Sequence, residues 1–245
     1  MKKTLLAVAA AAASATVFAQ TAAEPAYTLS YNVGVVSDYR FRGISQSRLK
    51  PALQGGIDFA HASGFYLGFW GSTIRILEDI PGGKGPVELD FYGGYKGKVN
   101  DDFSYDVGLL RYQYPRENFV TTPNTTELYA AGTWKILTVK YSHSLGKETF
   151  GVPNSRGSGY LEAAAAFDLG EGFSLTPHVG RQYFKDNGYA SYTDYSLALG
   201  KDLGNGFSLS AGVFGTNADK VFYASGANGK FLGKTGVVLG AKYSF

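Results

Sequence analysis

Residues Gly236–Phe245, GVVLGAKYSF, indicate the fold more directly than any other stretch of the sequence. Side chains alternate between two faces in an extended strand. One face here is entirely apolar and ends in two aromatic residues, and it consists of Val237, Leu239, Ala241, Tyr243 and Phe245. A strand that runs to the last residue of a sequence is expected to be hydrogen-bonded along both edges, as in a closed barrel. We therefore predict that this strand closes a β-barrel.

The first residues are typical of a secretory signal peptide. Lys2 and Lys3 form a positive start, an Ala-rich apolar segment follows, and Val17-Phe18-Ala19 suits a signal peptidase. We expect cleavage after Ala19, so that residues 1–19 are the signal peptide and residues 20–245 form a single outer-membrane β-barrel domain. A buried N-terminal helix is the less favoured alternative.

The composition excludes several classes of protein. The sequence has no cysteine, which excludes disulfides and metal sites built on thiolates. No apolar run reaches the ~20 residues that a transmembrane helix needs. The formal charge is +3, and no basic cluster indicates nucleic acid as a partner. With 33 glycines and 15% aromatic residues, the chain is better suited to strands and tight turns than to helices.

Alternation of apolar and polar residues continues along the chain and gives about twelve strands. The expected strands are 27–42, 51–62, 65–74, 87–99, 103–114, 127–136, 137–145, 160–169, 173–184, 192–203, 207–216 and 236–245. Long and short connections alternate between them, as in outer-membrane barrels, where the short turns are periplasmic. The fold class is therefore predicted as all-β, a transmembrane antiparallel up-and-down β-barrel of about 12 strands. We place it in the bacterial outer membrane, with both termini periplasmic.

Aromatic residues recur at the same level of successive hairpins. Such a level is typical of a membrane girdle at the lipid–water interface. The predicted girdle consists of Phe65, Phe103, Trp134, Phe173, Phe207, Tyr243 and Phe245. A second belt at the opposite end is expected from Tyr39, Phe41, Tyr112, Tyr114, Tyr183 and Phe184. Packing in a protein core is the alternative for any single one of these residues.

Charged residues occupy the face opposite the apolar one in nearly every expected strand. Charge is costly in a dry core but natural in a water-filled lumen, which favours a channel over a β-sandwich. The predicted channel-lining residues are Asp38, Arg40, Arg42, Asp58, Glu88, Asp90, Lys96, Lys98, Asp106, Glu127, Lys135, Lys140, Glu162, Asp194 and Lys242, and His178 and Lys201 share the pattern. About twelve strands should enclose a narrow pore. Both signs of charge are present, so selectivity and structural ion pairs remain open interpretations.

No catalytic or metal-binding pattern is present. The three histidines lie on different expected strands without the spacing of metal ligands. Ser142, His143 and Ser144 cannot act together, because neighbours on a strand face opposite sides. We therefore expect no enzyme activity, no metal and no cofactor.

The first long loop is basic, with Arg40, Arg42, Arg48 and Lys50. These charges could attract anionic solutes or lipopolysaccharide phosphates. Solvated loop charges without a partner are the favoured interpretation.

Three segments resemble a known family. Gly34–Gln46, GVVSDYRFRGISQ, is similar to the N-terminal hallmark of the TorF porin family, and residues 69–72, FWGS, and 88–95, ELDFYGGY, fit the same pattern. The resemblance covers essentially the whole chain after residue 19. It implies an outer-membrane protein of Gram-negative proteobacteria with a role in transport, and it offers no catalytic or binding residues to carry over.

The function predicted from these features is passive diffusion of small hydrophilic solutes through a narrow, charge-lined lumen. The main alternative is a non-transporting structural or adhesive barrel that presents its loops. A barrel enzyme such as a lipase and a soluble periplasmic β-protein are weaker alternatives. The expected partners are outer-membrane lipid and lipopolysaccharide, the barrel-assembly machinery through the C-terminal strand, and small polar solutes, but no nucleic acid.

Overall fold

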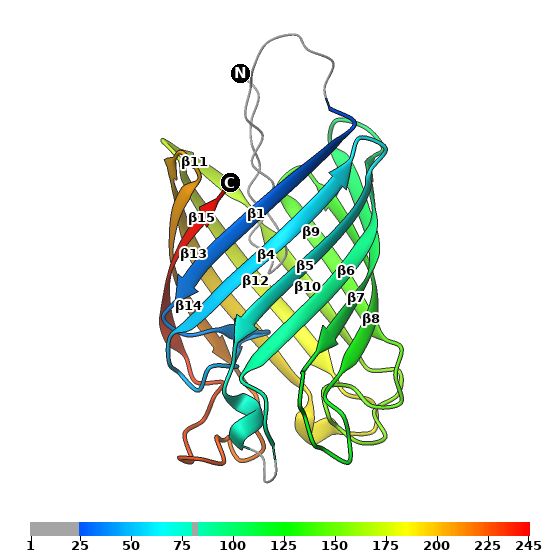
Figure 1. The fold of residues 1–245 in the computed structure, drawn as a ribbon, viewed down its shortest axis with the longest axis vertical. Coiled ribbons are helices and arrows are strands. Elements are labelled where there is room, and N and C mark those ends of the chain that lie inside the picture. The colour runs from blue at the N-terminus through cyan, green and yellow to red at the C-terminus, as the bar shows by residue number, and fades with distance from the viewer. Residues whose placement is uncertain (1–24, 80–82) are drawn as a thin grey trace.

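A closed antiparallel β-barrel forms the body of the protein (Figure 1). The structure is a computed structural model that describes residues 25–79 and 83–245. The predicted signal peptide, residues 1–19, lies outside the described residues. The strands are β1 (Tyr27–Val36), β2 (Arg40–Phe41), β3 (Ile44–Ser45), β4 (Ala52–His61), β5 (Phe65–Thr73), β6 (Val87–Lys98), β7 (Phe103–Gln113), β8 (Thr125–Trp134), β9 (Leu137–Ser144), β10 (Gly159–Ala165), β11 (Phe167–Gly170), β12 (Phe173–Tyr183), β13 (Tyr192–Gly204), β14 (Phe207–Thr216) and β15 (Gly236–Ser244).

Twelve wall strands, which we call staves, form the barrel. This number excludes β2 and β3, which form a separate hairpin, and treats β10 and β11 as two parts of one wall strand. Each stave pairs with its neighbours in the sequence, β10 pairs with both β9 and β12, and β1 pairs with β15. The prediction of about 12 strands in an up-and-down barrel is confirmed. Two short 3-10 helices, Ile76–Asp79 and Gly188–Ala190, lie in the loops.

Short turns lie at one end of the barrel and long loops at the other, and the chain's last strand finishes at the short-turn end (Figure 1). One of the two-residue turns is Lys135–Ile136, where Lys135 has a φ of 54° and Trp134 pairs directly with Leu137. Positive φ is typical of two-residue hairpin turns. This turn corrects one prediction, since Lys135 lies in the turn beside Asp102, at 3.8 Å, and does not line the lumen.

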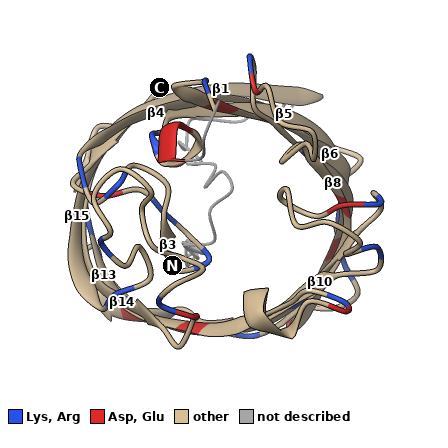
Figure 2. Ribbon diagram, turned by 90° about the horizontal axis from the view of Figure 1, so that it is seen from below, with Lys and Arg blue, Asp and Glu red and all other residues tan. Residues whose placement is uncertain are grey.

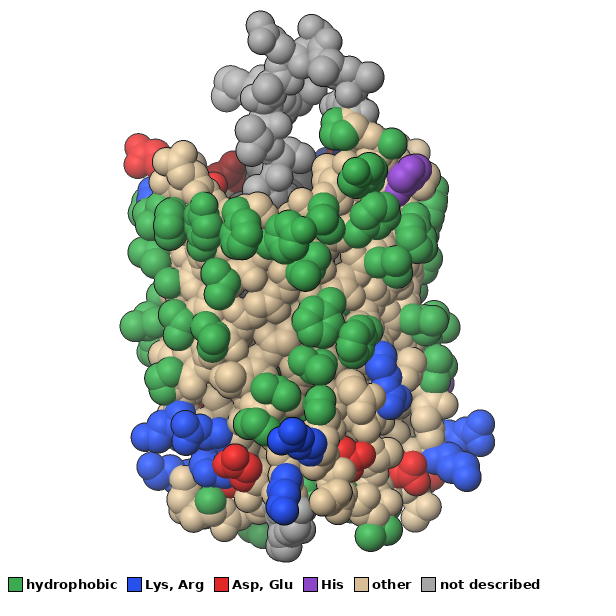
Figure 3. All heavy atoms as spheres, in the orientation of Figure 1, with side chains coloured by type: hydrophobic (Ala, Val, Ile, Leu, Met, Phe, Trp, Pro, Cys, Tyr) green, Lys and Arg blue, Asp and Glu red, His purple; other side chains and the backbone are tan. Residues whose placement is uncertain are grey.

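The outward faces of the staves are apolar, and the inward faces are polar. Alternating outward residues of β1, such as Leu29 and Val33, are 49% and 44% exposed. On the face seen in Figure 3, a band of apolar side chains crosses the barrel near the short-turn end, whereas most charged side chains gather at the long-loop end. None of the helices among the described residues is long and apolar enough to cross a membrane.

Tyrosines that point into the barrel lie flat against glycines of neighbouring strands. Tyr92 lies over Gly68, and Tyr66 lies over Gly94, each of them directly paired in the register of β5 and β6. Tyr160 lies over Gly180 as a diagonal neighbour, since Gly180 itself pairs with Glu162. A side chain at any of these glycines would collide with the phenol ring. The glycines therefore allow large rings to follow the wall instead of crossing the lumen.

We expect Gly180→Ala to destabilise the barrel by about 1–3 kcal/mol, the usual cost of overpacking. A Cβ at this position would displace the phenol of Tyr160, which is 3% exposed and donates a hydrogen bond to Asp194 Oδ2 at 2.9 Å. Urea unfolding in detergent micelles measures the effect. Gly188→Ala is the matched control, because nothing lies within 4 Å of the Cβ that it would add. Equal unfolding midpoints for the two variants would contradict the expectation.

Candidate functional site: the lumen and its inward loop

The segment between β1 and β4, residues 37–51, folds into the barrel, and we call it the inward loop. β1 ends at Val36, and the chain then turns inward and forms the β2–β3 hairpin, visible inside the ring of staves in the end-on view (Figure 2). The prediction of one continuous strand from Tyr27 to Arg42 is therefore wrong at its end. Arg42 and Gly43 have φ values of 47° and 79°, which form the tight reversal between Phe41 and Ile44.

Arg42 at the tip of this hairpin joins two staves on the far side of the barrel. Its guanidinium donates to Glu127 of β8, at 3.0 Å to Oε1 and 2.6 Å to Oε2, and to Gln182 Oε1 of β12 at 2.6 Å. It also lies over the ring of Tyr160, 4.1 Å from the centroid. Burial opposes the charge of the guanidinium, but the facing Glu127 carboxylate, together with Tyr112 and Tyr160, outweighs burial and raises the pKa of Arg42 above its ordinary value. We call this contact the Arg42 latch.

The base of the inward loop is held by a second set of polar contacts. Asp38 accepts hydrogen bonds from Arg40 Nε and Ser45 Oγ, each at 2.5 Å. Arg40 also donates to the backbone carbonyls of Leu232 and Lys234, at 3.0 and 3.1 Å. Both partners of the Asp38–Arg40 ion pair are almost fully buried, so each charge is neutralised by the other within the loop and not by solvent.

Apolar packing fixes the inward loop between two small clusters. Ile44 is 3% exposed and packs with a cluster that includes Phe184 and Leu232. Tyr39 packs with a second cluster that includes Tyr112 and Tyr114. The prediction of a second aromatic belt is therefore wrong for most of its members. Four of the six are buried inside the long-loop end, namely Tyr39, Tyr112, Tyr114 and Phe184. Phe41 packs against the same cluster as Tyr39, and only Tyr183 of the six is largely exposed, at 51%.

Two carboxylates lie beneath the inward loop, and within the described part of the chain neither has a cationic partner. Glu88 is fully buried and accepts a hydrogen bond from the Tyr39 hydroxyl at 3.0 Å, while its Oε2 has no partner. Asp90, two residues along the same face of β6, is 8% exposed and its Oδ1 has no partner. Burial raises the pKa of the Tyr39 phenol, and the neighbouring Glu88 and Asp90 raise it further, so Tyr39 stays a hydrogen-bond donor.

Four charged or titratable side chains form a network across β9, β10, β12 and β13, which we call the wall network. Glu162 is its centre, with Oε2 3.1 Å from His178 Nε2 and Oε1 3.9 Å from Lys140 Nζ. His178 Nδ1 lies 3.6 Å from Asp194 Oδ1. The prediction that His178 shares the lumen pattern agrees with this placement. These contacts stiffen one side of the lumen wall and match charges of opposite sign.

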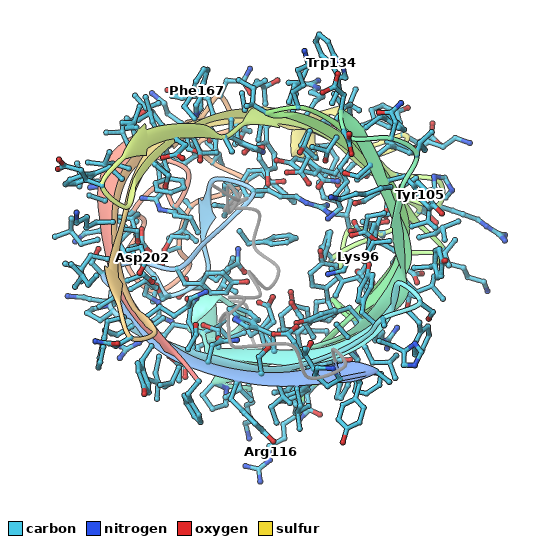
Figure 4. All side chains as sticks on the ribbon, turned by 90° about the horizontal axis from the view of Figure 1, so that it is seen from above. Lys96, Tyr105, Arg116, Trp134, Phe167 and Asp202 are labelled. Atoms are coloured by element: carbon cyan, nitrogen blue, oxygen red, sulfur yellow. The ribbon has the colours of Figure 1, made fainter. Side chains whose placement is uncertain are left out.

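The other side of the wall joins acids to tyrosines. Tyr92 donates to Asp58 Oδ1 at 2.5 Å, and Tyr66 donates to Asp106 Oδ1 at 2.5 Å. Asp106 faces Lys96 in the register of β6 and β7, and Lys96 points into the ring whereas Trp134 points away from it (Figure 4).

Two further predicted lysines have distinct positions. Lys98 shares the inward face of Lys96 but lies at the strand's exposed end. Lys242 of β15 shares the inward alternation and is opposite Gly34. Lys201 is wrongly predicted to face inward, since it lies in register with Phe173, and its Nζ is 3.9 Å from the centroid of that ring.

The predicted girdle residues are exposed on the outer wall near the short turns. Phe65, Phe173 and Phe207 are 43%, 38% and 54% exposed. Phe103, Trp134 and Phe245 share this exposure, and the half-buried Tyr243 packs against Phe207 in a tilted arrangement with the ring centroids 4.4 Å apart. Their role at a membrane interface remains a prediction.

Periodicity alone could not find the Arg42 latch, because the residues that it joins are far apart in the sequence. Glu127 is 85 residues and Gln182 is 140 residues from Arg42. Gln182, which is 1% exposed, was not among the predicted lumen residues. The Arg42-Gly43 step was the only local signal of a turn, since Gly readily adopts a positive φ.

This architecture defines the protein as a twelve-stranded, antiparallel up-and-down β-barrel, and solved structures of porins share this fold. The fold is similar to the KdgM porin, with a TM-score of 0.56, 12% identity, and coverage of 89% of this chain and 98% of that chain. It is similar to the NanC porin, with a TM-score of 0.53, 10% identity, and coverage of 89% of this chain and 99% of that chain. The fold is also similar to an outer-membrane channel from Pseudomonas putida F1, with a TM-score of 0.52, 11% identity, and coverage of 92% of this chain and 99% of that chain.

The chain belongs to the family described as bacterial protein of unknown function (Gcw_chp), whose match covers residues 19–245. No curated protein matches the sequence.

Proposed function

We propose that this protein is an outer-membrane channel for passive diffusion of small hydrophilic solutes, with a lumen that the inward loop narrows. The observation that carries the proposal is the division of the wall: outward faces are apolar, and inward faces bear Asp58, Lys96, Asp106, Lys140 and Lys242 on five different staves. Charged side chains on an inward face suit a water-filled lumen. We further infer that the long loops face outward from the cell and that both termini face the periplasm, because outer-membrane barrels have short periplasmic turns and longer external loops.

The porin-like fold supports the same proposal, and so does the resemblance to the TorF porin family, whose name stays a prediction. One structure of this fold is described as the KdgM porin in complex with disordered oligogalacturonate. In this chain Glu88 and Asp90 are buried beneath the inward loop, so a solute in the lumen would instead meet the more accessible side chains of Asp58, Lys96 and Asp106, which carry both signs of charge.

Single-channel recording in planar bilayers tests the proposal, and steps of defined conductance are the expected result. Solute flux into liposomes is the complementary measurement. The alternative is a non-transporting barrel, and the observation that favours it is the packing of Ile44 and Tyr39 into apolar clusters across the long-loop end. Absence of both conductance and flux, from protein shown to be folded, would favour this alternative.

We expect Lys96→Glu to shift ion preference towards cations by about a few fold, because substitutions in the lumen of such barrels alter selectivity. Lys96 points into the lumen, where its Nζ is 5.6 Å from the centroid of the Tyr66 ring. The reversal potential in a salt gradient measures the change. Lys201→Glu makes the same charge change on the outer wall and should leave the reversal potential unchanged. Equal shifts in the two variants would contradict a conducting lumen at Lys96.

A further inference from the structure

The outer wall carries charge of only one sign. Among the described strands, the charged side chains in outward register are Arg111, Arg181 and Lys201, and no acid shares that face. Arg111 and Arg181 occupy equivalent places, each two residues before the long-loop end of its strand. Each donates from its Nη1 to a threonine of the next strand, Arg111 to Thr126 at 3.1 Å and Arg181 to Thr193 at 3.3 Å.

A pocket of about 740 Å³ lies at the long-loop end of the same wall. Three bases line it, namely Lys147, Arg156 and Lys185, together with the acids Glu148 and Asp186. The three bases are exposed, and none forms an ion pair with an acid of the described residues. The pocket lining therefore holds three bases against two acids, an excess of positive charge that no ion pair in residues 25–79 and 83–245 neutralises.

Buried hydrogen bonds hold the two loops that form this pocket. Thr149 donates from its backbone N–H to Ser155 Oγ at 2.8 Å, and Ser158 Oγ donates to the Ser155 carbonyl at 2.5 Å. The second loop is tied to the first, since the Lys185 N–H donates to Ser158 Oγ at 3.0 Å and Asn187 Nδ2 donates to the Pro153 carbonyl at 3.0 Å. The bases thus project from a preformed scaffold.

Arg181 extends this basic surface down the wall. It lies opposite Leu161 of β10, which in turn lies opposite Tyr141 of β9, and Tyr141 precedes His143 of the pocket by two residues. Tyr141 and Leu161 are 47% and 52% exposed, so an apolar surface for acyl chains adjoins the bases. Unpaired bases above an apolar wall match the phosphates and chains of an anionic lipid.

We propose that this pocket, with Arg181 below it, binds the phosphate groups of a phosphorylated glycolipid in the leaflet at the long-loop end. Three of the four basic residues of the inward loop are already paired, and the fourth, Lys50, is a single exposed base that does not line this pocket. Arg40 and Arg42 are paired with Asp38 and Glu127 inside the barrel, and Arg48 lies 2.6 Å from Asp79. The proposal is independent of whether the barrel conducts, and it replaces the first long loop as the candidate lipopolysaccharide contact.

Binding of lipid A to the mature chain in detergent, followed by native mass spectrometry, tests the proposal. We expect the triple variant K147Q/R156Q/K185Q to bind lipid A at least about tenfold more weakly, because charge-assisted hydrogen bonds to phosphate are lost. The single variant R181Q should weaken binding to a smaller extent. The matched control K220Q/K230Q/K234Q removes three exposed bases from another long loop and should bind like the unaltered protein.

The ligand series separates the sources of phosphate. Lipid A without its phosphates should bind at least about tenfold more weakly than intact lipid A, and inorganic phosphate alone should not displace bound lipid. Undiminished binding by the triple variant would overturn the proposal, as would equal binding of the dephosphorylated lipid. Displacement by inorganic phosphate would identify a free-anion site instead of a lipid site. Heat-modifiable mobility on gels verifies that each variant is folded.

Discussion

Arg42→Ala will release the inward loop, raise the conductance of the barrel and destabilise the folded state. The guanidinium contacts both carboxylate oxygens of Glu127 and the amide oxygen of Gln182, so the substitution removes three hydrogen bonds at once. It also leaves Glu127, which is 1% exposed, as an unpaired buried charge. Breaking a buried ion pair in this way costs about 3–5 kcal/mol. Planar-bilayer recording and urea unfolding measure the two effects.

A double-mutant cycle separates the effect of breaking the Arg42–Glu127 contact from the effect of removing either side chain alone. Glu127→Ala should raise conductance as Arg42→Ala does, and the double variant should be less destabilised than the sum of the single variants, because the unpaired charge is then absent. Arg111→Ala is the control for removing a wall arginine, since Arg111 faces outward and should leave conductance unchanged. Conductance in Arg42→Ala equal to that of the unaltered protein would show that the inward loop does not limit the pore.

The barrel was predictable from sequence because its determinants are local. Alternation in a segment such as Val87–Lys98 reports the two environments of a strand directly, and a register shift of one residue would reverse every side chain. Short turns with glycine, aspartate or asparagine then separate the strands. These two signals fixed the number and order of the staves.

The inward loop was not predictable by the same means. Tyr39 and Phe41 continue the alternation of β1, so periodicity extends the strand past Val36, where the chain in fact turns inward. What decides the turn is tertiary: Tyr39 donates to Glu88, and Arg42 reaches Glu127, across separations of 49 and 85 residues. Contacts between distant staves leave no pattern in the local sequence. Lys135 was misplaced for a simpler reason, since strand ends carry the weakest signal.

β1 pairs with β4 along one edge and with β15 along the other, and the pairing with β15, which we call the β1–β15 seam, is the shorter of the two. All of Tyr27–Val36 pairs with β4, whereas only Asn32–Val36 pairs in regular register with Gly240–Ser244. Phe245 extends this seam by one step. Its N–H donates to the Tyr31 carbonyl at 3.0 Å, and its carbonyl accepts from the Tyr31 N–H at 2.8 Å. Its ring stacks on Tyr31 and Tyr243, with centroids 5.6 and 5.4 Å apart.

Deletion of Phe245 should therefore strongly reduce the amount of closed barrel in the outer membrane. Two backbone hydrogen bonds, each on the order of 1 kcal/mol, are lost together with both ring contacts. The heat-modifiable fraction in outer-membrane extracts measures the loss. Phe173→Ala is the control, because Phe173 is exposed near the same end of the barrel on β12, which pairs with neither β1 nor β15. If the deletion assembles normally, the seam does not need Phe245. If Phe173→Ala is equally impaired, assembly depends on aromatic area at this end of the barrel and not on closure of the seam.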